Sequence, residues 1–200
     1  MPATTATPAA APSAPSADAL GHLAAALAVP IAVIDAVADD QWTDATPCPG
    51  WDVAAVVTHL RDGTWWFSGT LGGPPPTGTA DARPATVLRE ASDALLAGFS
   101  RPGALDAVIP IPLGEVPGIV ALHLRATEAL VHGWDVAVAT GQDLVVDDAV
   151  AGEALGFSVA ALEMLPPERS PFAPPRPVTD DAPPLTRLVA LLGRDPSGPA

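Results

Sequence analysis

The segment IVALHLRATEALVHGWDVAVATG (residues 119–141) decides the fold, because it predicts a long helix over about residues 119–139 that ends before Gly141. A second helical segment follows Asp18, a candidate N-cap, where leucine and isoleucine recur at spacings of three and four. Pro30 interrupts this apolar face, so we expect either a kink there or two shorter helices.

Four further helices are indicated by apolar residues at helical spacing and by residues that favour helix ends. Asp52 is a candidate N-cap, and Pro84 suits the first position of a helix. These helices cover about residues 53–67, 84–99, 147–164 and 185–192, and Gly193 stops the last. Proline- and glycine-rich loops fill residues 69–78, 101–118 and 166–184; the second has room for a short extended piece, but we expect no β-hairpin. The pattern predicts an all-α fold, an antiparallel four-helix bundle with long loops and a short C-terminal helix.

The domain organisation follows from composition. Residues 1–16 contain Ala, Pro, Thr and Ser after the first Met, and such a segment buries too little side chain to offset its ordering entropy. We therefore expect a disordered tail at 1–16, one helical domain over residues 17–196, and a flexible C-terminus at 197–200.

Charge and composition exclude several classes of partner. The 200 residues carry a formal net charge of −14 and include no lysine, which argues against binding nucleic acid or anionic lipid. No apolar run reaches the roughly 20 residues that a membrane-spanning helix needs. The single cysteine excludes an internal disulfide framework, and the N-terminal residues do not resemble a signal peptide. We expect a cytoplasmic protein, and the sequence leaves a homodimer open.

A candidate metal site is indicated by Glu128 and His132, whose i, i+4 spacing places both side chains on one helix face. His59 lies at the border of the apolar face of its helix, where bundles build metal sites, and is the best candidate for a third ligand. Two histidines and one carboxylate leave a coordination position open, as catalytic zinc requires, and also accept Ni²⁺, Fe²⁺ or Mn²⁺. The alternative is a surface Glu–His pair worth a few tenths of a kcal/mol, about 0.2–0.5.

Neighbouring charges leave alternatives open. Asp135 either orients a metal-binding histidine or pairs with Arg125 or solvent. Arg125 either pairs with Glu128 or binds an anionic substrate. His22 and His123 do not suit the same metal, because His123 points away from Glu128 on its helix and His22 lies near the tail.

Cysteine and tryptophan residues flank the candidate ligands. Cys48 lies in a proline-flanked turn and is either a packed apolar side chain, which is the commoner case, or a nucleophile or soft ligand. Four tryptophans either form an apolar wall above the metal or belong to the core, namely Trp51, Trp65, Trp66 and Trp134.

Two blocks, TPCPGWDVAAVVTHL (46–60) and TEALVHGWDVAVATG (127–141), resemble the metal-binding domain of the mycothiol-dependent maleylpyruvate isomerase family, within the DinB/YfiT-like superfamily. The ending DDAPPLTRLVALLGRDP (180–196) resembles a small actinobacterial branch of that family. The resemblance implies a DinB-like four-helix bundle with the metal among its helices. It also implies that His59, Glu128 and His132 are the ligands.

The resemblance implies a thiol-dependent function that uses a divalent metal, most simply Zn²⁺, and mycothiol to act on a small electrophilic substrate. The isomerase has a further C-terminal domain for which this chain has no room, so the isomerase reaction itself is not carried over. Two alternatives stay open. One is metal-assisted hydrolysis by a bound water, and the other is a non-enzymatic binding module stabilised by its metal.

Overall fold

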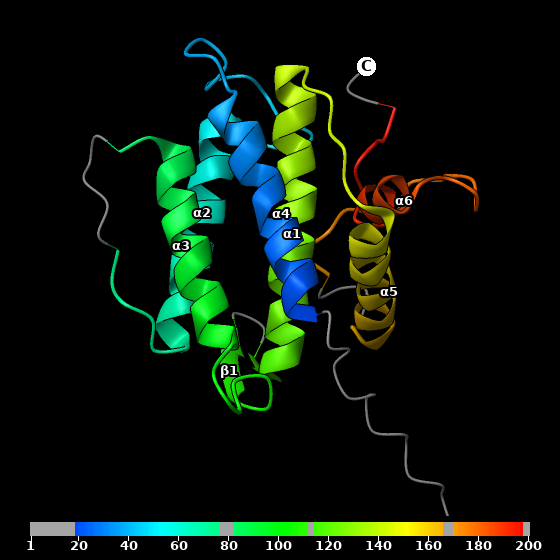
Figure 1. Ribbon diagram of the computed structural model, residues 1–200. Helices are drawn as coiled ribbons and strands as arrows, with labels where there is room; N and C mark the ends of the chain where they lie inside the picture. The colour runs from blue at the N-terminus through cyan, green and yellow to red at the C-terminus, as the bar shows by residue number, and fades with distance from the viewer. Residues whose placement is uncertain (1–18, 77–81, 112–113, 166–169, 198–200) are drawn as a thin grey trace, which may run out of the picture.

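The computed structural model describes residues 19–76, 82–111, 114–165 and 170–197 (Figure 1). The predicted tail at 1–16 and the last three residues of the predicted flexible C-terminus lie outside the described residues. The helices are α1 (Ala19–Asp35), α2 (Val53–Thr70), α3 (Pro84–Phe99), α4 (Gly118–Thr140), α5 (Asp148–Met164) and α6 (Pro184–Leu191). Among the described residues no helix is both long enough and apolar enough to cross a bilayer.

Helices α1 to α4 form the bundle. Helix α1 packs on α4 and α3, and α2 packs on α3 and α4. Figure 1 shows α1 and α4 running in one direction and α2 and α3 in the other, so that α2 and α3 are parallel to each other. Helix α5 packs on the outside of α4, and α6 lies across one end of α5 (Figure 1). The predicted all-α fold of packed helices is thereby confirmed, with α5 and α6 outside the bundle.

The helix ends agree with the local sequence signals. The Asp52 side chain accepts a hydrogen bond from the Ala55 N–H at the start of α2, which confirms its role as an N-cap. Gly141 ends α4 with a φ of 67°, a left-handed conformation that favours glycine. Pro30 lies inside a single continuous helix, so the alternative of two shorter helices is wrong.

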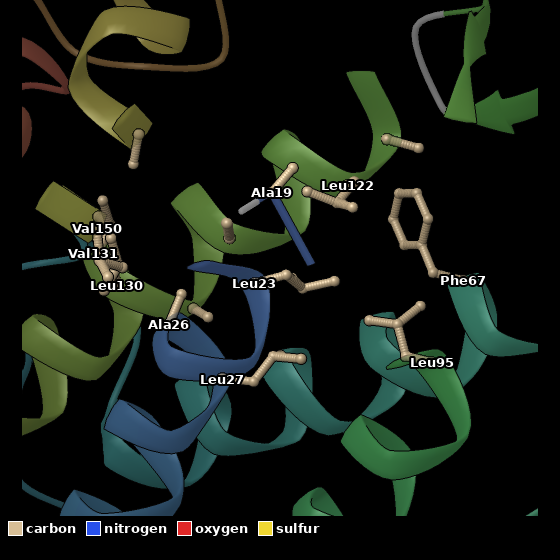
Figure 2. Packing of buried hydrophobic residues seen from close by; sticks show 14 of the residues in the cluster. Ala19, Leu23, Ala26, Leu27, Phe67, Leu95, Leu122, Leu130, Val131 and Val150 are labelled. Carbon is tan, nitrogen blue, oxygen red and sulfur yellow. The ribbon is translucent and has the colours of Figure 1, made fainter. Parts of the chain in front are cut away.

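The core is built mainly from leucine, alanine and valine. Figure 2 shows Leu23 and Leu27 of α1 packed between α4 and the side chains of Phe67 and Leu95. Helices α1 and α4 approach each other closely at Gly133, where an added Cβ would lie 3.0 Å from Val29 Cγ1. Glycine at position 133 therefore permits the close packing of α4 on α1.

The expectation of no β-hairpin is wrong. Strand β1 (Val108–Ile111) pairs antiparallel with β2 (Gly114–Pro117), and Ile109 is opposite Val116. Pro110 is tolerated because a two-stranded sheet leaves one edge of each strand without a partner, so the missing N–H costs no ladder bond there. Ile109 is buried between exposed neighbours, and this short alternation was masked by the surrounding prolines and glycines.

A cluster of three ionisable side chains joins α5 to α1 and α4. Glu153 of α5 contacts His22 Nδ1 of α1 through one oxygen, and its other oxygen lies 3.5 Å from His123 Nδ1 of α4. His123 also stacks on Phe157, with ring centroids 5.1 Å apart. Burial lowers the pKa of His123, as does the nearby His22, while the carboxylate of Glu153 opposes this.

The close approach of α1 and α4 generates a stability prediction. Gly133→Ala is expected to destabilise the fold by about 1–3 kcal/mol, because the new methyl group overpacks Val29 and Pro30. Gly152→Ala on α5 is the matched control, because nothing lies within 4 Å of its added Cβ, and it should gain about 0.5–1 kcal/mol. Urea denaturation measures both. An unchanged stability of Gly133→Ala would contradict the close packing of these two helices.

The lowered pKa of His123 predicts a pH dependence. As the pH falls below about 6.5, the unfolded chain takes up a proton on this residue before the folded protein does, so acidification favours unfolding. His123→Gln removes this contribution and should lose less stability than the wild type between about pH 7.5 and about pH 5.5. Thermal denaturation across that range is the measurement. If the two proteins lost equal stability, the pKa of His123 would not be lowered in the folded protein.

Candidate metal centre

Four ionisable residues form a polar stripe along the inner side of α4, namely Arg125, Glu128, His132 and Asp135. Their spacings of three, four and three residues place them on one helix face. Arg125 is 1% exposed and Asp135 is fully buried, whereas the side chain of Glu128 is 37% exposed. Because burying an unpaired charge is costly, the partners of this polar stripe determine what the site can do.

Glu128 lies between two helices and has a partner on each. The Arg125 guanidinium donates a hydrogen bond to Glu128 Oε2 from the preceding turn of α4. His59 Nε2 of α2 lies 3.5 Å from the same oxygen. Burial opposes ionisation of Glu128, but the charge of Arg125, the hydrogen bond with His59 and the charges of both histidines lower its pKa to about 2. The carboxylate is therefore ionised at neutral pH.

Arg125 is held in the core by α2. Its Nη2 donates a hydrogen bond to Thr64 Oγ1 at 3.0 Å, and its guanidinium lies 5.2 Å from the centroid of the Phe67 ring. An added Cβ at Gly63 would lie 3.0 Å from Arg125 Nη1, so this glycine leaves room for the guanidinium. Of the two roles that the sequence left open for Arg125, the structure shows the pairing with Glu128.

His132 is oriented by Asp135. Its Nδ1 lies 2.9 Å from Asp135 Oδ2, and both side chains are buried. Asp135 in turn accepts hydrogen bonds from Arg194, which comes from the segment after α6. Pairing of Asp135 with Arg125 is therefore wrong, because Arg125 is already engaged by Glu128 and Thr64. The hydrogen bond to Nδ1 leaves Nε2 as the nitrogen of His132 that can bind another group.

The two candidate histidines face each other across α2 and α4. Their ring centroids are 5.1 Å apart at an interplanar angle of 78°. Trp51 packs against both rings, with its centroid 4.9 Å from His59 and 5.9 Å from His132. His59 therefore lies beside both Glu128 and His132, and Trp51 packs against the two imidazole rings.

The other tryptophans lie elsewhere. Trp134 packs against the core, and Trp66 is 44% exposed. Trp65 and Trp42 line a separate cavity of about 630 Å³ between α2 and α3. Neither histidine nor Glu128 lines that cavity. Of the four predicted tryptophans, Trp51 alone is shown in ring contact with the candidate ligands within the described residues.

Cys48 lies beside the buried end of the polar stripe. Among the described residues, its Sγ, a ring nitrogen of His132 and a carboxylate oxygen of Asp135 all lie within 4.8 Å of one another. Burial and the nearby Asp135 raise the pKa of the Cys48 thiol, while Arg194 opposes the shift. Because Arg194 occupies both oxygens of Asp135, this group is organised as a hydrogen-bonded network, and Cys48 stays a neutral thiol at its side.

The predicted trio of His59, Glu128 and His132 is not among the groups of described residues whose donor atoms all lie within 4.8 Å of one another; the group that meets this distance is Cys48, His132 and Asp135. By residue type, the trio has the chemistry of a metal site. Two imidazoles and one ionised carboxylate are suitable ligands for zinc or a similar ion, and three protein ligands leave a position open. Nδ1 of His132 already has a carboxylate partner, as is usual for metal-binding histidines. Arg125 competes for the Glu128 carboxylate, so a bound cation would share this side chain with the guanidinium.

Comparison with known proteins places the chain in a family. The chain is 36% identical over 172 residues to uncharacterized proteins from two strains of Mycobacterium tuberculosis, covering 82% of this chain and 90% of each relative. Crystal structures of the mycothiol-dependent maleylpyruvate isomerase and of a mutant of it share the fold, each with a TM-score of 0.58. They are 13% and 12% identical to this chain, respectively, and cover 74% of it and 70% of their own length.

The family model of the mycothiol maleylpyruvate isomerase N-terminal domain matches residues 20–137, which include all three candidate ligands and Asp135. The resemblance found in the sequence blocks is thereby confirmed. The chain belongs to the mycothiol maleylpyruvate isomerase N-terminal domain family.

Proposed function

We propose that His59, Glu128 and His132 bind one divalent cation, preferably Zn²⁺, and that the protein uses it with mycothiol in a transfer or isomerisation of a small electrophilic substrate. The observation that carries the proposal is the Glu128 carboxylate, ionised and placed 3.5 Å from His59 Nε2, with the His132 ring facing His59. The family supports the thiol, because the structural neighbour is named as mycothiol-dependent.

The residues of the chain have separable roles in this proposal. A bound cation would supply Lewis acidity that favours the thiolate form of a thiol. Glu128 contributes negative charge, and Arg125 keeps that carboxylate ionised and fixed in direction. Asp135 fixes the ring of His132, and Trp51 shields one side of both imidazoles from water. The half-buried edge at His59 and Glu128 leaves an approach from solvent for a small molecule.

The substrate of the structural neighbour is not assigned to this chain, since 13% identity supports the fold alone. A low-molecular-weight thiol as partner fits a reducing compartment, and we therefore propose a cytoplasmic location. The same donor set would activate a bound water, so metal-assisted hydrolysis is the competing outcome that the thiol experiment below separates.

Metal binding is tested by removing single ligands. His132→Ala and Glu128→Ala should each lose most of the bound zinc with little change in helix content, because three ligands leave no spare donor. His123→Ala is the matched control, a histidine of the same helix that contacts Glu153 instead, and it should retain its zinc. Elemental analysis after dialysis measures the zinc content of each protein. If His123→Ala released the metal while His132→Ala kept it, the ligand assignment would be wrong.

Thiol chemistry is tested with mycothiol and monochlorobimane, a reactive electrophile that becomes fluorescent on forming a thioether. The zinc-loaded protein should accelerate adduct formation, and the apo protein and His132→Ala should not. The reaction without protein is the baseline. Adduct formation that is no faster with zinc-loaded protein than at this baseline would exclude thiol transfer and favour a metal-bound water or a non-enzymatic role.

A further inference from the structure

We propose that Arg194, in the segment after α6, is a positioning residue for the candidate metal centre, which it reaches through Asp135. In this proposal Arg194 holds the Asp135 carboxylate in the direction that keeps a proton on His132 Nδ1, so that the lone pair of His132 Nε2 is available to a ligand. The expected effect of Arg194 on zinc binding rests on the proposed function, whereas its expected effect on the His132 ring does not.

The contacts form a continuous buried chain from the C-terminal segment to α4. Arg194 Nη2 donates to Asp135 Oδ2 at 3.0 Å and Arg194 Nε donates to Oδ1 at 3.3 Å. His132 Nδ1 lies 2.9 Å from the same Oδ2. The guanidinium therefore engages both carboxylate oxygens, and this two-point grip prevents the carboxylate from rotating away from the imidazole.

The fold fixes Arg194 from its backbone outward. Its N–H donates to Val189 O at 3.0 Å, and the N–H of Gly193 donates to Ala190 O at 3.0 Å, the paired bonds of a Schellman motif at the end of α6. Gly193 has a φ of 84°, and an added Cβ would lie 2.7 Å from the Ala173 backbone oxygen, so glycine is required there. Arg194 Nη1 also donates to Leu192 O at 3.0 Å. The hydrogen bonds at the end of α6 thus direct the Arg194 side chain toward Asp135.

Each carboxylate of the polar stripe forms an ion pair with one buried arginine. Arg125 holds Glu128, and Arg194 holds Asp135. Asp135 is fully buried and Arg194 is 8% exposed, so the pair is shielded from solvent and from salt. The family model matches residues 20–137, which include Asp135 but not Arg194, its buried partner.

This arrangement predicts a defined tautomer. A carboxylate accepts hydrogen bonds and cannot donate them, so Asp135 favours the neutral imidazole that carries its proton on Nδ1. Mutation of a residue that hydrogen-bonds to a metal-binding histidine typically weakens metal binding by about 10–100-fold. Loss of the Arg194 grip should therefore be visible in two ways, as a change in the His132 tautomer without metal and as weaker zinc binding.

The experiment compares Arg194→Lys and Arg194→Gln with Arg187→Gln, a control at an exposed arginine of α6. Long-range ¹H–¹⁵N spectra of the full-length apo protein near pH 8, above the ordinary range of histidine titration, report the tautomer of His132, and His132→Ala assigns its signals. Competition with a chromophoric chelator measures the zinc dissociation constant. Arg194→Lys keeps the charge but not the two-point grip, so it carries the test if Arg194→Gln does not fold.

We expect the Nδ1–H tautomer in the wild type and in Arg187→Gln, and a shift toward the Nε2–H tautomer in the Arg194 variants. Zinc should bind about 10-fold more weakly in Arg194→Lys and up to about 100-fold more weakly in Arg194→Gln. An unchanged tautomer and unchanged zinc affinity in folded Arg194 variants would overturn the proposal. If the tautomer shifts but the wild type binds no zinc, Arg194 still positions the His132 ring through Asp135, and the proposed function fails.

Discussion

The structure depends on the burial of a charged stripe on its central helix. Arg125, Glu128, His132 and Asp135 occupy α4 positions that a helical bundle normally fills with apolar side chains. Each ionised group that leaves water must find a partner, or the fold loses several kcal/mol, about 3–5 for a broken buried pair. Some of these partners lie within α4 itself, as in the Arg125–Glu128 and His132–Asp135 pairs, and the others come from α2 and from the segment after α6.

This requirement explains why distant segments meet along α4. Thr64 and His59 face α4 from α2, and Gly63 leaves the space that the Arg125 guanidinium fills. Arg194 reaches Asp135 because Gly193 turns the chain at the end of α6. The polar stripe is therefore satisfied at its buried end and only half covered at His59 and Glu128. That uncovered edge is where we propose that a cation binds.

Much of the fold and part of the site could be predicted from the sequence. The i, i+4 spacing of Glu128 and His132 is a local signal, and the capping role of Asp52 is another, so both could be found without coordinates. His59 was placed near them by its position at the border of an apolar helix face, together with the family resemblance. These signals are short in range, because each depends on residues within one or two turns of a helix.

The parts that sequence could not supply are long in range. Asp135 and Arg194 are 59 positions apart, and nothing near Arg194 marks it as a buried cation rather than a surface one. Pairing of Asp135 with Arg125 is excluded because the two residues are ten positions apart on α4, and because Glu128 and Thr64 already occupy that guanidinium. The β1–β2 hairpin was missed because its alternation covers only four residues on each strand. The contacts of Trp51 depend on how the turn before α2 folds onto both histidines.

The central claim is that His59, Glu128 and His132 share one cation. Crystals grown with zinc and without chelator, with anomalous diffraction recorded on both sides of the zinc absorption edge, test it most directly. We expect one strong anomalous peak within about 2.0–2.2 Å of the His59, Glu128 and His132 donor atoms. The absence of a peak there, or a peak bounded instead by Cys48 and Asp135, would contradict it.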